Sequence, residues 1–319
     1  MKKLSFVIPV YRNQGSLAES HRRIQDLLET RLARFSFEIV FIDDGSDDAS
    51  LGELIEISRR DDRVKVLALT KNFGQVSAVV AGLRETTGDA AIILSADLQE
   101  PIEKIPEMVQ AWVGGSEIVI CYRQARQDTL MARLSSRLFY GLIRLASPTM
   151  PATGFDFFLL GRPALSVINQ LKERNRFFQG DILWLGFRTT MLPYERQRRS
   201  VGRSQWTTSR KVKYFLDGLL STSYWPIRAM PILGFLTFGA GLVYSGLIVW
   251  AWVVRSTPFT GWAPIMIVCL ALGGLNMLML GILGEYVWRI YDELRGRPSY
   301  IIRERILNGA PVPDRNDPR

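Results

Sequence analysis

Carboxylate and amide side chains gather in two short segments, and each segment follows an apolar run. SADLQEP at 95–101 places Asp97 and Gln99 two residues apart, and DDGSDD at 43–48 begins with the adjacent Asp43 and Asp44. Side chains two apart on an extended segment can point the same way, so Asp97 and Gln99 could offer two oxygens to one ligand. Mg²⁺ or Mn²⁺ beside a diphosphate suits such a pair, because these cations complete their shell with phosphate oxygens and water. Either segment alone is also a common turn sequence.

The elements that must position these side chains are strands that alternate with helices. Five short apolar runs have the length of strands: 4–11, 37–44, 64–69, 90–96 and 117–122. The stretches between them have helical periodicity: near 15–32, 49–60, 75–86 and 102–113. Near-continuous apolar strands between helices predict a doubly wound α/β domain, whose parallel sheet is covered on both faces. Ligands bind at the carboxyl ends of such strands, where the segments PVYRN, IDDGSDD and SADLQEP are expected to lie.

The net charge of +9, from 40 basic and 31 acidic residues in 319, is concentrated in one place. Residues 1–195 hold equal numbers of basic and acidic side chains, whereas residues 196–213 hold seven basic ones and no acid. Because a nucleic-acid-binding domain usually carries a basic face, the neutral 1–195 region argues against that class. The basic run favours an anionic membrane surface or a phosphate ligand, with a solvated charge run as the alternative. The single His21 excludes a histidine triad, and the distant Cys121 and Cys269 exclude a disulfide framework.

An apolar segment follows the basic run. Residues 229–284 carry one charged side chain, Arg255, and their length predicts two membrane-spanning helices at 229–254 and 263–284. Arg and Lys are more frequent on both outer flanks than in the connecting loop, so the positive-inside rule places both termini in the cytoplasm. We therefore expect a multi-pass protein of the inner (cytoplasmic) membrane with a cytoplasmic catalytic domain.

Basic amphipathic helices are expected at 130–146 and 209–224, beside the membrane segment. Each could cover the domain core or lie in the lipid interface; the interface is favoured for 209–224, and neither alternative is favoured for 130–146. The expected organisation is a catalytic domain at 1–208, a juxtamembrane amphipathic helix at 209–228, a two-helix hairpin at 229–290 and a cytoplasmic tail at 291–319.

These segments together resemble the polyprenyl-phosphate glycosyltransferases of glycosyltransferase family 2, the branch that includes dolichol-phosphate mannose synthase and bacterial undecaprenyl-phosphate sugar transferases. The resemblance rests on FVIPVYRN, IDDGSDD and SADLQEP and on four further segments: TKNFGQ (70–75), TGFDFFLLGRPAL (153–165), RNRFFQGDILWLGF (174–187) and RRSVGRSQW (198–206). It implies a GT-A fold, which is Rossmann-like with a mostly parallel sheet. It also implies an inverting hexosyltransferase that moves a sugar from a nucleotide donor, UDP-linked as in bacterial members, to a membrane polyprenyl phosphate. Relatives of this kind tend to form homo-oligomers through their membrane helices.

The resemblance also implies a set of site residues. Asp97 and Gln99 match the metal and diphosphate positions, with Mg²⁺ or Mn²⁺ as the cofactor, and Asp156 matches the acidic catalytic residue beside the acceptor. The positions matched to the nucleobase are Pro9, Tyr11 and Asp44, with Asp43 close by. The positions matched to the donor or acceptor phosphates are Arg123, Arg199 and Ser204. The chain departs from the family pattern at Ser95, where an Asp is usual, at Lys71, where Arg is frequent, and at Gln205, where Lys or Arg is frequent.

The acceptor chemistry limits what the site has to supply. A phosphate monoester has a second pKa near 6, so it is mostly ionised and nucleophilic in the cytoplasm. The site must chiefly hold two anions close together, which is catalysis by positioning and electrostatic stabilisation, and Asp156 is expected to orient more than to deprotonate.

Two alternative functions remain. A processive polysaccharide synthase is disfavoured because the chain lacks a Gln-x-x-Arg-Trp string, and a catalytically impaired membrane scaffold is favoured by Ser95 alone.

Overall fold

The computed structural model describes residues 1–97, 99–123, 151, 154–171, 173, 176–195, 225–255 and 262–312. The chain divides into two compact units, one of Met1–Gly218 with Pro298–Arg319 and one of Leu219–Arg297. The first unit contains a sheet flanked by helices, and the second contains two long helices.

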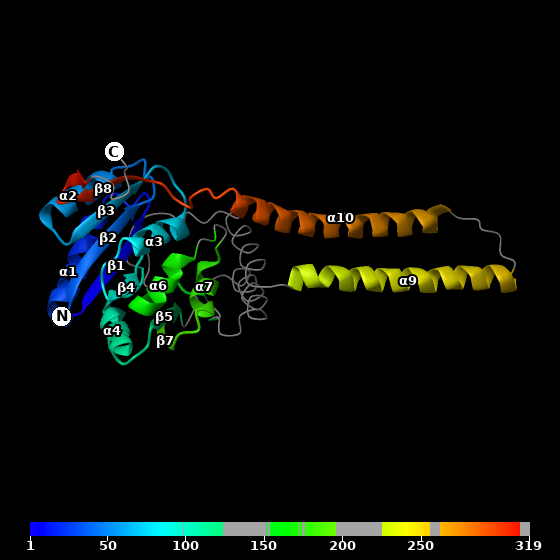
Figure 1. The fold of residues 1–319 in the computed structure, drawn as a ribbon, viewed down its shortest axis with the longest axis horizontal. Coiled ribbons are helices and arrows are strands. Elements are labelled where there is room, and N and C mark those ends of the chain that lie inside the picture. The colour runs from blue at the N-terminus through cyan, green and yellow to red at the C-terminus, as the bar shows by residue number, and fades with distance from the viewer. Residues whose placement is uncertain are drawn as a thin grey trace. The chain divides into compact units, whose positions relative to one another are not determined.

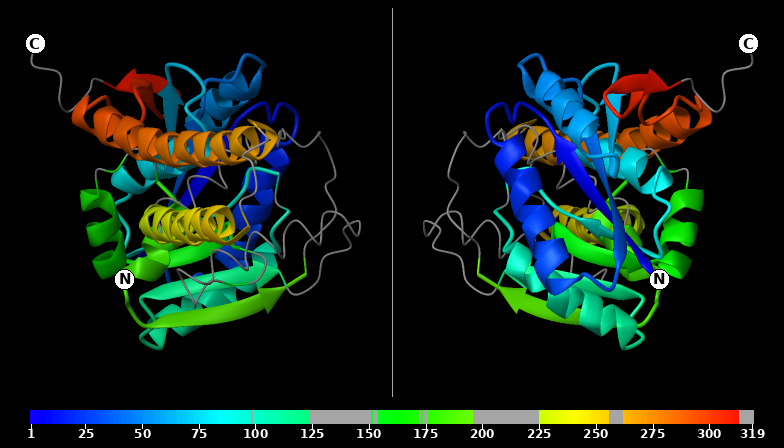
Figure 2. Two further views of the ribbon diagram at one scale, coloured as in Figure 1. Left: turned by 90° about the vertical axis from the view of Figure 1, so that its right-hand side faces the viewer. Right: turned by 90° about the vertical axis from the view of Figure 1, so that its left-hand side faces the viewer.

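Within the described residues, the strands of the first unit form one sheet in the order β7-β5-β6-β4-β1-β2-β3-β8-β9 (Figure 1). The strands are β1 (Lys3–Val10), β2 (Ser36–Asp43), β3 (Val64–Leu69), β4 (Ala90–Ile93), β5 (Ile118–Arg123), β6 (Phe157–Gly161), β7 (Thr189–Tyr194), β8 (Ile302–Leu307) and β9 (Ala310–Val312). The four strands β4, β1, β2 and β3 are parallel neighbours. β6 runs antiparallel to β4 and β5, while β7 lies parallel beside β5 at one margin (Figure 2). The predicted Rossmann-like, mostly parallel sheet is confirmed.

Helices cover both faces of this sheet, as the apolar strands predict. The helices are α1 (Leu17–Arg31), α2 (Ser50–Arg60), α3 (Gln75–Arg84), a 3-10 turn η1 (Ile102–Lys104), α4 (Ile105–Val113), α6 (Arg162–Gln170) and α7 (Phe178–Trp184). One apolar cluster contains residues of α1, α2 and α4, and the other contains residues of α3, α6 and α7. On β1, Phe6 and Ile8 belong to the first cluster and Val7 to the second. A strand buried on both faces needs an uninterrupted apolar run, which is what the sequence shows.

The C-terminal strands were not foreseen. The sequence pattern predicts a cytoplasmic tail at 291–319, whereas β8 pairs antiparallel with β3 and β9 pairs with β8. Ile306 of β8 is 1% exposed and belongs to the same apolar cluster as α1, α2 and α4. The segment 302–312 therefore extends the sheet of the first unit, although more than 230 residues separate it from β3 along the chain.

The second unit consists of α9 (Trp225–Arg255) and α10 (Trp262–Leu294) in its described residues. Both helices expose large apolar side chains, among them Phe235 (76%) on α9 and Met277 (70%) on α10. Within the described part of the chain, none of the helices has the length and apolar character needed to cross a membrane. The two predicted membrane-spanning helices are therefore not confirmed. The predicted amphipathic helices at 130–146 and 209–224 lie outside the described residues.

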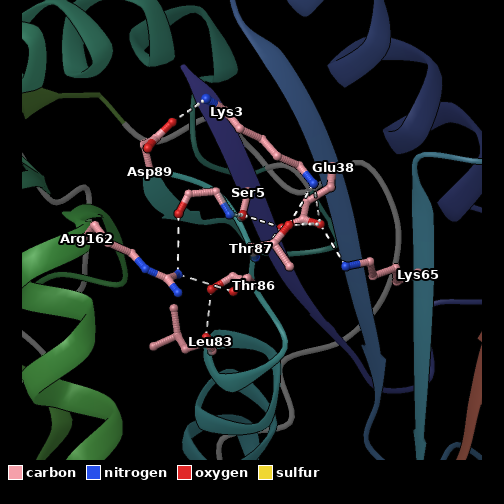
Figure 3. A network of polar contacts seen from close by, with 10 residues as sticks. Lys3, Ser5, Glu38, Lys65, Leu83, Thr86, Thr87, Asp89 and Arg162 are labelled. Atoms are coloured by element: carbon pink, nitrogen blue, oxygen red, sulfur yellow. Dashed lines mark hydrogen bonds and ion pairs between the residues drawn. The ribbon is translucent and has the colours of Figure 1, made fainter. Parts of the chain in front are cut away.

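A buried ion cluster joins the amino ends of the parallel strands. Glu38 of β2 is 2% exposed, and its carboxylate forms ion pairs with Lys3 Nζ of β1 at 3.0 Å and Lys65 Nζ of β3 at 2.8 Å (Figure 3). Ser5 Oγ and the backbone N–H of Thr87, which precedes β4, each donate to the same carboxylate at 2.6 Å. Burial opposes the charge, but the hydrogen bonds from Lys65, Ser5, Thr87 and Lys3 outweigh it and lower the pKa of Glu38 from 4.5 to about 2. This carboxylate thus links four neighbouring strands, at the edge opposite the candidate site.

Candidate active site

The segment that follows β4 forms a compact polar turn. Ser95 Oγ donates to Asp97 Oδ1 at 2.8 Å and also contacts the Glu100 carboxylate. The backbone N–H of Gln99 donates to the same Asp97 oxygen at 3.3 Å. At the position where the family usually has Asp, the Ser95 hydroxyl lies between two carboxylates, so it orients Asp97 instead of adding a third negative charge.

Glu100 is a site residue that its sequence context alone does not single out. Its side chain is 4% exposed. Burial raises the pKa of its carboxyl, and the nearby negative charges of Asp156 and Asp97 raise it further. Asp97 follows β4 and Asp156 precedes β6, and these two strands pair antiparallel, so both predicted residues lie at the same edge of the sheet. The only sequence signal for Glu100 is its position within the SADLQEP segment.

Three strand ends bring Arg123, Asp156 and Tyr194 together. Arg123 ends β5, Asp156 immediately precedes β6, and Tyr194 ends β7. Since β5 lies between β6 and β7, Arg123 Nη2 comes 3.9 Å from Asp156 Oδ2 and Arg123 Nε donates to Tyr194 Oη at 3.3 Å. Burial disfavours the Arg123 cation, but Tyr194, Asp156 and Glu100 outweigh burial and raise its pKa. The guanidinium is therefore a permanent positive charge beside the acidic residues.

The predicted nucleobase residues lie at the neighbouring ends of β1 and β2. Pro9 pairs with Ile42 in the ladder, and the N–H of Asp44 donates to the Val10 carbonyl at 2.8 Å, so Tyr11 and Asp44 follow adjacent strand ends. The Asp44 oxygens accept from the backbone N–H of Phe73 at 2.7 Å and of Gly74 at 2.9 Å. The Asp44 carboxylate thus holds the loop before α3, which sequence reasoning did not foresee. Contact of Asp44 with a nucleobase stays a prediction.

Asp43 is also turned toward its own loop. Its carboxylate is 1% exposed and accepts from the backbone N–H of Ser46 at 3.3 Å. Burial raises the pKa of this carboxyl, and the hydrogen bonds from Ser46 oppose that effect. Asp43 therefore stabilises the turn at 43–46. The remaining predicted phosphate residues, Arg199 and Ser204, lie outside the described residues.

Gly45 is required where this loop approaches the loop before α3. Its φ is +67°, and a Cβ there would lie 2.3 Å from the backbone carbon of Lys71. We expect Gly45→Ala to destabilise the protein by roughly 1–3 kcal/mol through backbone strain and to weaken nucleotide binding, measured by thermal unfolding and calorimetry. Gly52→Ala is the matched control: no atom lies within 4 Å of its added Cβ in α2, so we expect it to be neutral or slightly stabilising. Equal stability of the Gly45→Ala variant and the wild type would contradict this account.

The residues predicted to bind a metal fit a cation that takes few protein ligands. Gln99 is 5% exposed, and its Oε1 atom is buried without a hydrogen-bond partner among the described residues. An unpaired buried amide oxygen beside Asp97 suits a hard cation, which prefers oxygen ligands. Across the described residues, no group of three or more His, Cys, Asp or Glu side chains is placed to hold a metal ion. A cation at Asp97 and Gln99 would therefore need oxygens from a bound phosphate or water.

A family model, several protein sequences and a solved structure are similar to this chain. The family described as Glycosyl transferase family 2 matches residues 5–167. The Bactoprenol glucosyl transferase of Shigella phage SfX is 33% identical over 305 residues, which cover 95% of this chain and 99% of that protein. The Uncharacterized glycosyltransferase YkcC of Bacillus subtilis is 32% identical over 302 residues, which cover 94% of this chain and 93% of that protein. A solved structure of the mannosyltransferase PcManGT from Pyrobaculum calidifontis, in complex with GDP-Man and Mn²⁺, is 15% identical with a TM-score of 0.49, covering 91% of this chain and 88% of that chain.

Proposed function

The chain belongs to glycosyl transferase family 2, and from this premise we propose that it transfers a hexosyl group from a UDP-linked sugar to a polyprenyl phosphate. The observation that carries the proposal is the approach of Arg123 Nη2 to Asp156 Oδ2 at 3.9 Å, at the edge where the Asp97 segment follows β4. The positive charge of Arg123 can offset the negative charge of a substrate that carries phosphates. The near-full-length similarity to a bactoprenol glucosyl transferase supports the polyprenyl phosphate acceptor.

In the proposed reaction the residues position two anions more than they move protons. The ionised acceptor phosphate attacks the anomeric carbon, and the nucleoside diphosphate leaves with inversion. Arg123 offsets phosphate charge near Asp156, whose side chain is 55% exposed and therefore accessible to a substrate. Asp156 is held by Gln179 Nε2 at 3.3 Å, so it orients the acceptor. Asp97 and Gln99 would hold Mg²⁺ or Mn²⁺, which when bound neutralises charge on the leaving diphosphate.

We also place the reaction at the inner membrane, with the catalytic domain and both termini in the cytoplasm. Support comes from the exposed apolar side chains of α9 and α10 and from the single charge in 229–284. In this proposal the segments 229–254 and 263–284 anchor the chain in lipid. The basic run at 196–213 then lies beside the lipid surface, where an anionic polyprenyl phosphate is found.

The test is direct detection of the product. The purified full chain in detergent is incubated with undecaprenyl phosphate, Mn²⁺ or Mg²⁺, and a panel of UDP- and GDP-linked sugars, and lipids are identified by mass spectrometry. We expect one sugar–phosphate lipid whose formation requires the acceptor, the cation and a UDP-linked donor. The donor that gives product identifies the sugar. Absence of product with every donor, from a folded protein, would overturn the proposal, and product from a GDP-linked donor alone would overturn the choice of UDP.

A further inference from the structure

Gln179 has an orientation that its neighbours fix. It lies in the first turn of α7 and is 6% exposed. Its Nε2 atom lies 2.5 Å from the Phe155 carbonyl oxygen and 3.3 Å from Asp156 Oδ1. The carbonyl can only accept, and so can the carboxylate when ionised, so the amide nitrogen must face them. The two hydrogens of the amide are thereby used.

The amide oxygen of Gln179 consequently faces away from Phe155 and Asp156. It is buried and lacks a hydrogen-bond partner among the described residues. Buried polar atoms in native proteins are nearly always hydrogen-bonded, and leaving one unsatisfied is unfavourable. A hydrogen-bond donor on a bound substrate would satisfy this acceptor, which belongs to the residue that holds the predicted catalytic Asp156.

The backbone around Gln179 keeps the amide in place. Arg176 Nε pairs with Asp181 Oδ2 at 2.9 Å, with side-chain exposures of 4% and 15%. The Phe178 ring packs on Phe158 of β6 with centroids 5.8 Å apart. Both flanks of the residue are thus anchored to the first unit. Turning the amide away would cost its two donor hydrogen bonds, so Gln179 can discriminate between substrates.

The chemistry of the substrates identifies the donor group. Ionised phosphates offer acceptors, and a polyprenyl chain offers no polar hydrogen, so neither can donate to Gln179 Oε1. The nucleoside also carries hydroxyls and an N–H, but its predicted residues follow β1 and β2, whereas Gln179 contacts Asp156, which precedes β6. The transferred sugar carries several hydroxyls, each of which can donate. We propose that Gln179 accepts a hydrogen bond from one hydroxyl of the transferred sugar while it positions Asp156, an inference that rests on the proposed function. Gln179 is then a specificity-determining residue of the donor site.

The test combines variants of Gln179 with donors that each lack one hydroxyl. With the wild-type chain, we expect one deoxy donor to lose about 10–100-fold in kcat/KM, since the analogue leaves the buried oxygen unpaired. In Gln179→Met, which cannot accept, the loss for that analogue should fall to about twofold or less while the losses for the other analogues persist. Gln179→Glu loses the amide hydrogens that bond to Phe155 and Asp156 and adds a negative charge beside Asp156, so it should lower kcat for every donor.

A control variant, Asn169→Leu, and a binding measurement by calorimetry distinguish a specific role of Gln179 from a general effect on the protein. Asn169 also has a buried amide oxygen without a partner in the described part of the chain, and its Nδ2 donates to the Leu83 carbonyl, so Asn169→Leu should leave the pattern of losses unchanged. Equal losses in Gln179→Met and the wild type would overturn the inference, as would a shift only in the Mn²⁺ requirement. Calorimetry with the same donors and no acceptor repeats the comparison as Kd values. A chain that binds sugar nucleotides but forms no lipid product would overturn the proposed function alone, and one that binds none would overturn both.

Discussion

Replacing Arg123 with Met is expected to lower kcat/KM for sugar transfer by about 10²–10³-fold, the size of effect seen when one preorganised electrostatic group is removed. The guanidinium lies 3.9 Å from Asp156 Oδ2 and donates to Tyr194 Oη at 3.3 Å. Without it, two phosphate-bearing substrates would have to approach Asp97, Glu100 and Asp156 with less compensating charge. Met matches the Arg side chain as far as the position of Nε, so it keeps the packing of the stem and limits the structural change.

Two further variants show whether the charge or its placement matters. Arg123→Lys keeps the charge but cannot reproduce the planar fork, so we expect a smaller loss of about tenfold. Tyr194→Phe removes the hydroxyl that accepts from Arg123 Nε at 3.3 Å and keeps the ring, which packs edge-on against Phe157. Because the surroundings raise the pKa of Arg123, the ratio between the wild type and Arg123→Met should be constant from pH 6 to 9. A folded Arg123→Met variant with wild-type kcat/KM would contradict a role at the phosphates.

Local patterns were sufficient for the parallel half of the fold. The strands at 4–11, 37–44 and 64–69 were predicted within a residue or two because each is an apolar run bounded by turn residues. The strand β8 was missed because IRERIL has three consecutive charged residues and carries no continuous apolar signal. Only its antiparallel register with β3, set by distant parts of the chain, makes it a strand. Pairing between segments so far apart cannot be deduced from local periodicity.

The residues of the site also fall into two groups: those that a short motif predicts, and those whose role depends on contacts between distant parts of the chain. Asp97 and Gln99 are recognisable from one segment, and the structure adds that Ser95 orients Asp97. Gln179 was missed because its importance comes from its approach to Asp156, 23 residues away. Tyr194 was missed for the same reason, since its partner Arg123 is 71 residues away. The predicted residues are those whose chemistry is visible in short motifs, and the missed ones are those that hold them in place.

The largest expected effect on stability comes from Glu38, far from the site. We expect Glu38→Gln to lower the free energy of unfolding by about 3 kcal/mol at pH 7, since a pKa displaced from 4.5 to about 2 corresponds to about 1.4 kcal/mol for each unit. The variant keeps the side-chain shape but loses the charge that pairs with Lys3 and Lys65. Glu19→Gln is the control, because Glu19 pairs with Arg22 at 2.7 Å while 56% exposed. Such surface pairs contribute about 0–1 kcal/mol.

The pH dependence of this difference identifies its cause. Because the folded state holds the Glu38 pKa below its ordinary value, the ionised carboxylate stabilises the fold fully above about pH 5, and this contribution is lost as the pH falls from 4.5 toward 2. Gln cannot titrate, so the gap between the wild type and Glu38→Gln should shrink to less than half between pH 7 and pH 3. Urea unfolding of the full chain in detergent, followed by circular dichroism, measures the gap at each pH. A gap of the same size at both pH values would mean that shape and neutral hydrogen bonds, not the buried charge, make Glu38 stabilising.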